Sequence, residues 1–274
     1  MPELPEVETM ARDLEAGLRG AAVVTVQVIR SDVLRHVTTR ALRERLHGAT
    51  LERVTRRAKS AVLQFRASRG TSHLVVTPRF TGALLIDGEP NDAYTCVRFD
   101  LADGRVLRYH DVRRLGTVAL FGDAGFDAWS AALGPEPLDP EFTAERFSGI
   151  IRGSKSAVKT ILMDQRRLAG VGNIYANEAL WRARIRPARR GTAVTRAESR
   201  TLFTHLRELL QEAIEQRGTS FRDYRDTRGE RGGYLELLRV YGRAGEPCAR
   251  CGTTLKGTHR IAGRQTVWCP TCQK

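Results

Sequence analysis

The sequence predicts an α+β protein of two domains, an N-terminal β-sandwich with flanking helices and a C-terminal helical domain that ends in a short β-hairpin. A series of short runs rich in β-branched and aromatic residues extends to residue 121, with turn signals between them. After residue 145 the apolar residues recur at helical spacing instead. A chain of 274 residues is long enough for two domains with separate cores.

The N-terminal region begins with a predicted helix from Pro5 to Leu18, which has apolar residues on one side and Gly20 beyond its end. A second helix, Thr39–His47, is closed by Gly48. We expect the strands to form a sandwich on which the first helix packs. The predicted strands are Val23–Ile29, Leu51–Val54, Ala61–Phe65, Leu74–Thr77, Ala83–Ile86, Thr95–Phe99, Val106–Tyr109 and Thr117–Phe121.

A linker is predicted where Gly134-Pro135-Glu136-Pro137 prevents regular structure. Three helices are expected after it, and the last begins with a capping-box pattern of Thr195 and Glu198. They span Ser156–Gln165, Asn173–Arg184 and Thr195–Gln216. The predicted parts of the chain are a β-sandwich domain (1–130), a linker (131–144), a helical domain (145–235) and a terminal hairpin module (236–274).

The terminal module contains two cysteine pairs with 17 residues between them, at a spacing typical of a four-cysteine zinc site. The predicted ligands are Cys248, Cys251, Cys269 and Cys272. A single structural zinc would hold the hairpin between the pairs, which is too small to bury a core of its own. The fifth cysteine, Cys96, falls within a strand pattern and is predicted to be a buried thiol.

The chain carries a net charge of +14, from 45 basic and 31 acidic residues, which indicates a polyanionic partner. No apolar run reaches the length of a membrane span, and the first residues do not have the pattern of a signal peptide. We therefore expect a cytoplasmic protein that does not insert into membranes. An odd cysteine count in a reducing compartment also argues against a disulfide framework.

The first residues carry a possible nucleophile. Removal of Met1 would leave Pro2 as a secondary amine, and α-amino groups have a pKa of about 7.7–8.0, well below that of lysine. Such an amine can attack an aldehyde carbon and form an iminium, and Glu3 and Glu6 are nearby acid/base candidates. The same residues also suit the start of a helix, so this pattern alone leaves both interpretations open.

The segment Met1–Thr9 resembles the amino terminus of bacterial formamidopyrimidine-DNA glycosylases, within the Fpg/Nei family. That resemblance implies a bifunctional base-excision-repair glycosylase and lyase, which removes 8-oxoguanine and formamidopyrimidines opposite cytosine through a Schiff base and β,δ-elimination. It implies that Pro2 is the nucleophile and Glu3 its acid/base partner. By the same resemblance, Lys59 assists catalysis, and Arg264 binds phosphate and assists the later elimination.

Further segments resemble the DNA-binding parts of the same family. Leu168–Glu178 is similar to its helix–two-turn–helix element, which implies that Asn173 is a phosphate ligand and that Lys155 and Lys159 add backbone contacts. His110–Gly116 resembles the loop that enters the gap left by an extruded base, so Arg113 would recognise the orphaned cytosine. The position of a DNA-contacting histidine in that family is taken by Tyr94.

The segment Thr77–Gly82 departs from the resemblance. Phe80 stands where the family has a methionine wedge, and Leu115 stands where it has a phenylalanine, so large and small side chains have exchanged places. We expect Phe80 to be the main wedge, stacking on neighbouring bases. In the alternative interpretation, Phe80 packs within the sandwich at the end of an apolar strand.

Two other functions fit parts of the pattern. An endonuclease VIII-type glycosylase for oxidised pyrimidines shares the proline and the zinc hairpin, although Leu4 and the loop 217–233 favour the purine enzyme. A non-enzymatic nucleic-acid-binding zinc protein would use only the charge and the cysteines. In that loop, Gly218–Tyr224 resembles the segment that folds over an everted purine, or is a flexible linker. The expected partner is damaged double-stranded DNA, bound by a monomer in the bacterial nucleoid.

Overall fold

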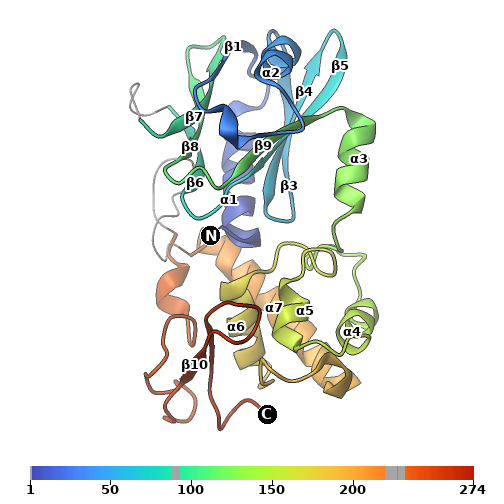
Figure 1. The fold of residues 1–274 in the computed structure, drawn as a ribbon, viewed down its shortest axis with the longest axis vertical. Coiled ribbons are helices and arrows are strands. Elements are labelled where there is room, and N and C mark those ends of the chain that lie inside the picture. The colour runs from blue at the N-terminus through green and yellow to red at the C-terminus, as the bar shows by residue number, and fades with distance from the viewer. Residues whose placement is uncertain (1, 88–92, 220–226, 228–231) are drawn as a thin grey trace. The chain divides into compact units, whose positions relative to one another are not determined.

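The structure is a computed structural model, which describes residues 2–87, 93–219, 227 and 232–274 (Figure 1). The chain divides into two compact units. The first unit comprises Met1–Ala132 and Gln216–Leu235, and the second comprises Leu133–Glu215 and Glu236–Lys274. The segment Gln216–Leu235 therefore belongs with the β-rich unit, whereas the sequence analysis placed it in the helical domain.

Contacts with the first helix and the sheet explain where this segment belongs. Arg217 forms an ion pair of 2.6 Å with Asp13, and the Thr219 N–H donates to the Glu6 carboxylate at 2.7 Å. The backbone N–H of Ile86 donates to the carbonyl of Thr227. The sequence resemblance at Gly218–Tyr224 lies mostly outside the described residues.

The first unit contains two sheets and the helix α1 (Leu4–Leu18). The four-stranded sheet has the order β1-β7-β8-β6, and the five-stranded sheet has the order β2-β9-β5-β4-β3. The strands are β1 (Val23–Val28), β2 (Leu34–Arg35), β3 (Thr50–Arg57), β4 (Ser60–Ala67), β5 (Gly70–Thr77), β6 (Gly82–Ile86), β7 (Thr95–Leu101), β8 (Val106–Asp111) and β9 (Thr117–Phe121). The expected sandwich is thus confirmed, with eight strands close to their predicted positions.

One apolar core joins α1 to both sheets (Figure 1). Val7, Leu14 and Leu18 of α1 are fully buried in it. Leu74 and Val76 contribute from the five-stranded sheet, and the four-stranded sheet adds residues such as Val97 and Phe99. Because burial of apolar side chains is the main favourable contribution to folding, α1 is an integral part of the sandwich core.

Two features of this unit were not expected from sequence. The short strand β2 pairs in parallel with β9, and a 3-10 helix, Ser31–Val33, leads into it. The helix α3 (Asp123–Ala131) has no fully buried residue, so it lacks the apolar stripe that predicts a helix. Aromatic contacts hold it instead, including a stack of Phe126 on His73 with centroids 4.4 Å apart.

The second unit is mainly helical, as expected. It contains α4 (Ala144–Arg152), α5 (Val158–Met163), α6 (Asn173–Arg182) and α7 (Arg196–Glu215), followed by the hairpin strands β10 (Lys256–Thr258) and β11 (Thr266–Trp268). Short 3-10 helices span Gly191–Ala193 and Tyr234–Leu237, the latter across the division between units. The helix α2 (Thr39–Leu46) belongs to the first unit.

Two helices of the second unit differ from prediction. The helix α4 was not anticipated, although Thr143 caps it by accepting the N–H of Arg146. The helix α5 is shorter than the predicted Ser156–Gln165, because the Gln165 side chain bonds the loop after it, at the carbonyl of Val171 and the N–H of Gly170. Among the described residues, no helix combines the length and apolarity needed to cross a bilayer.

The helix α6 organises the chain that leads into the terminal hairpin. The buried Glu178 carboxylate accepts the backbone N–H groups of residues 239–241 at 2.8–3.0 Å. One turn further along, the Trp181 indole donates to the Cys248 sulfur at 3.5 Å. The Asn177 side chain accepts the N–H of Val267 on β11. Three side chains of one helix thus hold three separate parts of the terminal module.

We predict that Glu178→Ala destabilises the second unit, because the buried N–H of Val240 would lose its acceptor at a cost of roughly 1–3 kcal/mol, and the partly buried N–H groups of Arg239 and Tyr241 would lose theirs as well. Urea unfolding followed by tryptophan fluorescence measures this, since Trp181 lies one turn from the change. Glu215→Ala, at the exposed end of α7, is the control and is expected to change stability by less than about 0.5 kcal/mol. Equal stability of the two variants would contradict the role assigned to Glu178.

Candidate functional site

The start of α1 positions the predicted nucleophile. Pro2 is buried, and Glu3 is the N-cap residue of the helix. The Glu3 N–H donates to the Glu6 carboxylate at 2.8 Å, and the two residues form a capping box. The helix-start interpretation of this segment is therefore confirmed, and it places the Glu3 carboxyl group one residue from the Pro2 nitrogen.

Glu6 has a different place from the one expected for an acid/base group. It is 1% exposed, and its two oxygens accept the backbone N–H groups of Glu3 and Thr219. Gly218 has a positive φ of 81°, and a Cβ there would lie 2.9 Å from the Glu6 side chain. The Glu6 carboxylate therefore connects the start of α1 to the segment that begins at Gln216.

Lys59 lies in the two-residue turn of the β3–β4 hairpin. Arg57 pairs with Ser60 across the turn, and Ala58 has a positive φ of 54°, as such tight turns require. Lys59 itself is half-buried. On the adjacent strand, Arg56 forms an ion pair with Glu8 of α1 at 2.9 Å, so the hairpin that carries Lys59 is attached directly to the helix that follows Pro2.

The predicted wedge residues lie on two loops of the first unit, which we call the wedge loops. The first wedge loop, residues 78–81, joins β5 to β6, and the second, residues 112–116, joins β8 to β9. The Arg113 guanidinium lies over the Phe80 ring, 5.0 Å from its centroid. Phe80 is half-buried and is not among the buried residues of the sandwich core, contrary to the alternative of core packing. Leu115 is 41% exposed, and its neighbour Val112 is also exposed. These apolar side chains are thus available on the surface of the loops.

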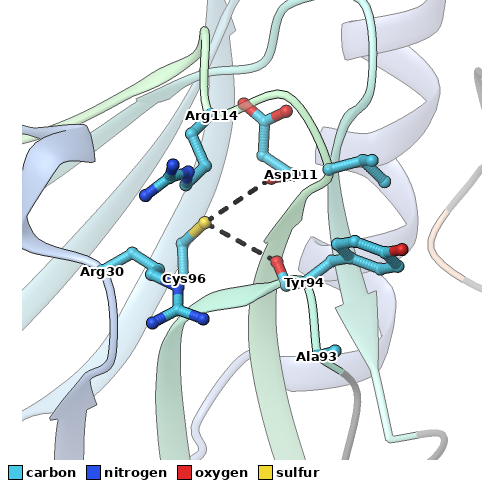
Figure 2. Close-up of a pocket in the computed structure, with 7 residues that line it drawn as sticks. Arg30, Ala93, Tyr94, Cys96, Asp111 and Arg114 are labelled. Atoms are coloured by element: carbon cyan, nitrogen blue, oxygen red, sulfur yellow. Dashed lines mark hydrogen bonds between the residues drawn. The ribbon is translucent and has the colours of Figure 1, made fainter.

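A pocket of about 320 Å³ lies beside the second loop. Its lining includes Arg30, Tyr94, Cys96, Asp111 and Arg114 (Figure 2). Figure 2 shows the two arginine side chains on one side of the thiol and the tyrosine ring on the other. Tyr94 is 51% exposed and packs edge-on against His110 with centroids 5.7 Å apart. The predicted DNA-contacting position is therefore an accessible aromatic side chain next to a basic pocket.

Cys96 is a buried thiol, as its strand pattern predicted. Its sulfur donates to the backbone carbonyls of Tyr94 and Asp111 at 3.6 and 3.8 Å. Burial and, secondarily, the negative charge of Asp111 raise the pKa of the Cys96 thiol to about 11. The nucleophilic thiolate is therefore scarce at neutral pH.

In the second unit, three of the predicted phosphate ligands lie at the ends of elements, with Asn173 half-buried and Lys155 and Arg264 exposed. Asn173 is the first residue of α6, and the N-terminus of a helix is suited to bind an anion. Lys155 is exposed before α5. Arg264 is exposed in the turn of the β10–β11 hairpin, where Ala262 and Gly263 have positive φ values.

Lys159 is placed differently from the expectation. The family resemblance implies a DNA contact for this lysine, but the residue is fully buried in α5. Its ammonium group donates to the carbonyl of Gln265 at 2.9 Å and to the hydroxyl of Thr266 at 2.7 Å. Both acceptors lie directly after Arg264, so Lys159 attaches α5 to the hairpin instead of presenting its charge on the surface.

The four predicted zinc ligands come together. The sulfur atoms of Cys248, Cys251, Cys269 and Cys272 all lie within 4.8 Å of one another. Tetrahedral zinc with four thiolates separates its sulfurs by about 3.8 Å, so the cluster fits such a site. The Trp181 indole N–H donates to the Cys248 sulfur, and the Arg250 guanidinium lies 4.2 Å from the centroid of that indole ring. Donors of this kind orient metal ligands and stabilise their charge.

Comparison with known proteins gives matches along nearly the whole chain. Residues 1–118 match the formamidopyrimidine-DNA glycosylase N-terminal domain, and residues 133–225 match the formamidopyrimidine-DNA glycosylase H2TH domain. Residues 245–274 match the zinc finger found in FPG and IleRS. The chain belongs to the formamidopyrimidine-DNA glycosylase family. The family resemblance inferred from the sequence is thereby confirmed.

Individual members of this family are similar over their full length. The formamidopyrimidine-DNA glycosylase of Pelotomaculum thermopropionicum is 40% identical over 278 residues, which cover 100% of this chain and 99% of that protein. A Lactococcus lactis FPG mutant in complex with Fapy-dG-containing DNA has a TM-score of 0.91 at 31% identity, with both chains fully covered. A complex of the Lactococcus lactis protein with abasic-site DNA also has a TM-score of 0.91, at 30% identity and 99% coverage of both chains.

We predict that Cys96 resists alkylation by iodoacetamide in the native protein at pH 8, because burial and a raised pKa keep the thiol protonated there. Its labelling should increase only as the pH approaches about 11 or after unfolding in urea. Peptide mass spectrometry separates Cys96 from the four terminal cysteines. Rapid labelling of the native protein at pH 8, at the rate of a free model thiol, would contradict this placement.

Proposed function

We propose that this protein is a bifunctional base-excision-repair enzyme, which removes oxidised purines from double-stranded DNA and then cleaves the strand at the abasic site. The observation that carries the proposal is the buried start of α1, where Pro2 is followed by Glu3 within a capping box. Family membership supports the glycosylase activity. The Fapy-dG and abasic-site complexes of the Lactococcus lactis protein support the substrate class.

In the proposed reaction, the neutral amine of Pro2 attacks C1′ of the damaged nucleoside after removal of Met1. The bond from C1′ to the base breaks, and the base leaves with its electron pair and receives a proton. The sugar ring opens, and the nitrogen then shares its lone pair with C1′ as an iminium. Glu3 supplies and accepts the protons of these steps. The iminium acts as the electron sink for elimination of the 3′ phosphate and then of the 5′ phosphate.

Two cations complete the proposed chemistry. Lys59, held in the tight turn attached to α1 through Arg56 and Glu8, assists proton transfer beside the phosphodiester. Arg264, exposed in the hairpin turn, binds a phosphate and assists the second elimination. Its guanidinium can hold a phosphate through two parallel hydrogen bonds.

DNA binding in this proposal draws on both units. Asn173, at the start of α6, and the exposed Lys155 bind backbone phosphates. Arg113 donates to the orphaned cytosine, while Phe80 and Leu115 fill the space left by the extruded base. Lys159 is not part of this set, because its ammonium is buried against the hairpin.

The four cysteines would hold one zinc ion, which supplies rigidity to the hairpin and takes no part in base excision. Arg264 lies between the two cysteine pairs, so its position depends on that rigidity. The contacts from Lys159 and Asn177 add support to β11 from the helical side.

We predict that borohydride covalently traps the wild-type protein on abasic-site DNA, because only an imine can be reduced to a stable amine. Glu3→Gln should abolish excision of 8-oxoguanine while DNA affinity survives, and Pro2→Gly should weaken excision. Glutamine keeps an oxygen that can cap α1, so this change separates proton transfer from helix capping.

Glu44→Gln, on the exposed face of α2, is the matched control and should behave as wild type. Unchanged excision kinetics in Glu3→Gln would remove this residue from the mechanism. Absence of any trapped complex with the wild-type protein would overturn the lyase and favour a DNA-binding protein without catalysis. Parallel assays with thymine glycol and 8-oxoguanine compare the purine assignment with an endonuclease VIII-type preference.

We predict one zinc ion per chain by elemental analysis, with its loss in Cys251→Ser and its retention in Cys96→Ser. Chelation should reduce DNA affinity more than it changes the β-sheet signal in far-ultraviolet circular dichroism. The reason is that these cysteines pack with the hairpin and with Trp181 and Val240 of the second unit, and none of them belongs to the core of the β-sandwich. Full DNA affinity in protein that contains no metal would contradict this role.

A further inference from the structure

A buried carboxylate lies where the two wedge loops meet. Asp111, at the end of β8, is 1% exposed and accepts four hydrogen bonds. One oxygen accepts the Thr81 hydroxyl at 2.6 Å and the N–H of Arg113 at 3.2 Å. The other accepts the Tyr109 hydroxyl at 3.0 Å and the N–H of Gly116 at 2.9 Å. These donors come from the loop that ends at Gly82, from β8 and from the loop that follows Asp111.

The first loop has a conformation that needs such support. Phe80 has a positive φ of 29°, a region that an aromatic residue adopts at a cost of about 1–3 kcal/mol. Thr81, the next residue, is fixed from both sides, since its hydroxyl donates to Asp111 and accepts the N–H of Arg113 at 3.0 Å. The residue after that, Gly82, pairs with Asp111 across β6 and β8.

Close packing at the same place leaves little freedom to the second loop. A Cβ at Gly116 would lie 1.9 Å from the Tyr109 hydroxyl and 2.8 Å from the carbonyl of Thr77. A Cβ at Gly82 would lie 2.9 Å from the same hydroxyl. Both loops therefore end in glycines that close around Tyr109 and Asp111, and neither can move independently of that pair.

The side chains of the two loops also meet, since the Arg113 guanidinium lies 5.0 Å from the centroid of the Phe80 ring. An arginine and an aromatic ring attract each other by about 0.5–1 kcal/mol at exposed sites, which is too little to hold two mobile loops together. The contact therefore depends on the backbone positions that the Asp111 carboxylate sets.

We propose that Asp111 is a positioning residue for base extrusion, which holds the two loops so that Phe80 and Arg113 meet the DNA as a pair already stacked. This inference rests on the glycosylase function proposed above. Ordering the pair before binding reduces the entropy lost when it enters the duplex. Extrusion of a base costs a few kcal/mol of unstacking and unpairing, so a preordered wedge lowers the barrier to the step that precedes chemistry.

The carboxylate is specifically required because an amide cannot replace it. Asparagine has one acceptor oxygen and one donating NH2 group. The hydroxyls of Thr81 and Tyr109 could rotate to accept from that group, but the backbone N–H groups of Arg113 and Gly116 could not. Asp111→Asn therefore keeps the side-chain size while one loop loses a backbone hydrogen bond.

The test compares two DNA substrates. With 8-oxoguanine paired to cytosine in a duplex, we expect Asp111→Asn to slow excision roughly 10- to 100-fold, the size of a positioning defect. With a preformed abasic site, where less unstacking is needed, cleavage and borohydride trapping should stay within about twofold of wild type. Asp103→Asn, in the exposed β7–β8 turn, is the control and should match wild type on both substrates.

Thr81→Val provides a second variant, which leaves the carboxylate in place and removes the hydroxyl that donates to Asp111 and accepts the N–H of Arg113. It should show the same selective loss on the lesion duplex. Phe80→Ala should be slow on the lesion duplex as well, and combining it with Asp111→Asn should add little further loss, since both changes act through one wedge. Multiplicative losses in the double variant would overturn the inference.

Three further outcomes would test the positioning role of Asp111. Wild-type excision rates in both Asp111→Asn and Thr81→Val would overturn the positioning role while leaving the proposed glycosylase intact. Equal losses on both substrates, together with a lower melting temperature, would overturn it in favour of a structural role. If the wild-type protein itself neither excises 8-oxoguanine nor traps on abasic DNA, the glycosylase function fails first, and the inference about Asp111 fails with it.

Discussion

Burial of the first helix is the constraint on which the rest of the β-rich unit depends. A chain terminus is normally the least ordered part of a domain, yet the proposed nucleophile is the second residue. Here α1 contributes fully buried apolar residues to a core shared with both sheets. The Glu6 carboxylate then accepts the N–H groups of Glu3 and Thr219, which lie far apart in the sequence. Apolar burial stabilises α1 within the core, and the Glu6 carboxylate fixes the position of the residues at its start.

The same division between apolar packing and buried polar contacts recurs elsewhere in the molecule. Asp111 holds two loops above the sandwich, and Glu178 holds the chain that approaches the hairpin in the second unit. In both cases a buried carboxylate accepts backbone N–H groups, which no rotation can redirect. Buried charges of this kind are costly unless they are fully bonded, so they specify one loop conformation more sharply than apolar contacts can.

Arginine side chains contribute in two ways that composition alone cannot separate. Some are structural, such as Arg250 over the Trp181 ring and Arg217 paired with Asp13. Others, such as Arg264, are exposed on turns. The net charge of +14 therefore overstates the charge available to a DNA backbone. Lys159 likewise adds to the net charge without being available to DNA, because its ammonium group is buried and donates to the carbonyl of Gln265.

The sequence by itself determined the features that depend on near neighbours. Short runs of β-branched and aromatic residues between turn signals predicted the strands of the sandwich, helical spacing predicted α1 and α7, and the paired cysteines predicted the cluster that the structure assembles. The family resemblance also came from contiguous motifs. The tertiary structure decided what depends on distant partners. Lys159 is buried because it donates to two acceptors on the hairpin, which lie 106 and 107 positions away in the sequence. The segment after Gln216 belongs to the first unit because it bonds to Glu6 and Asp13, which lie more than 200 positions away. A hydrogen bond between such distant residues leaves no periodic trace in the sequence, because only the folded core brings its two partners together.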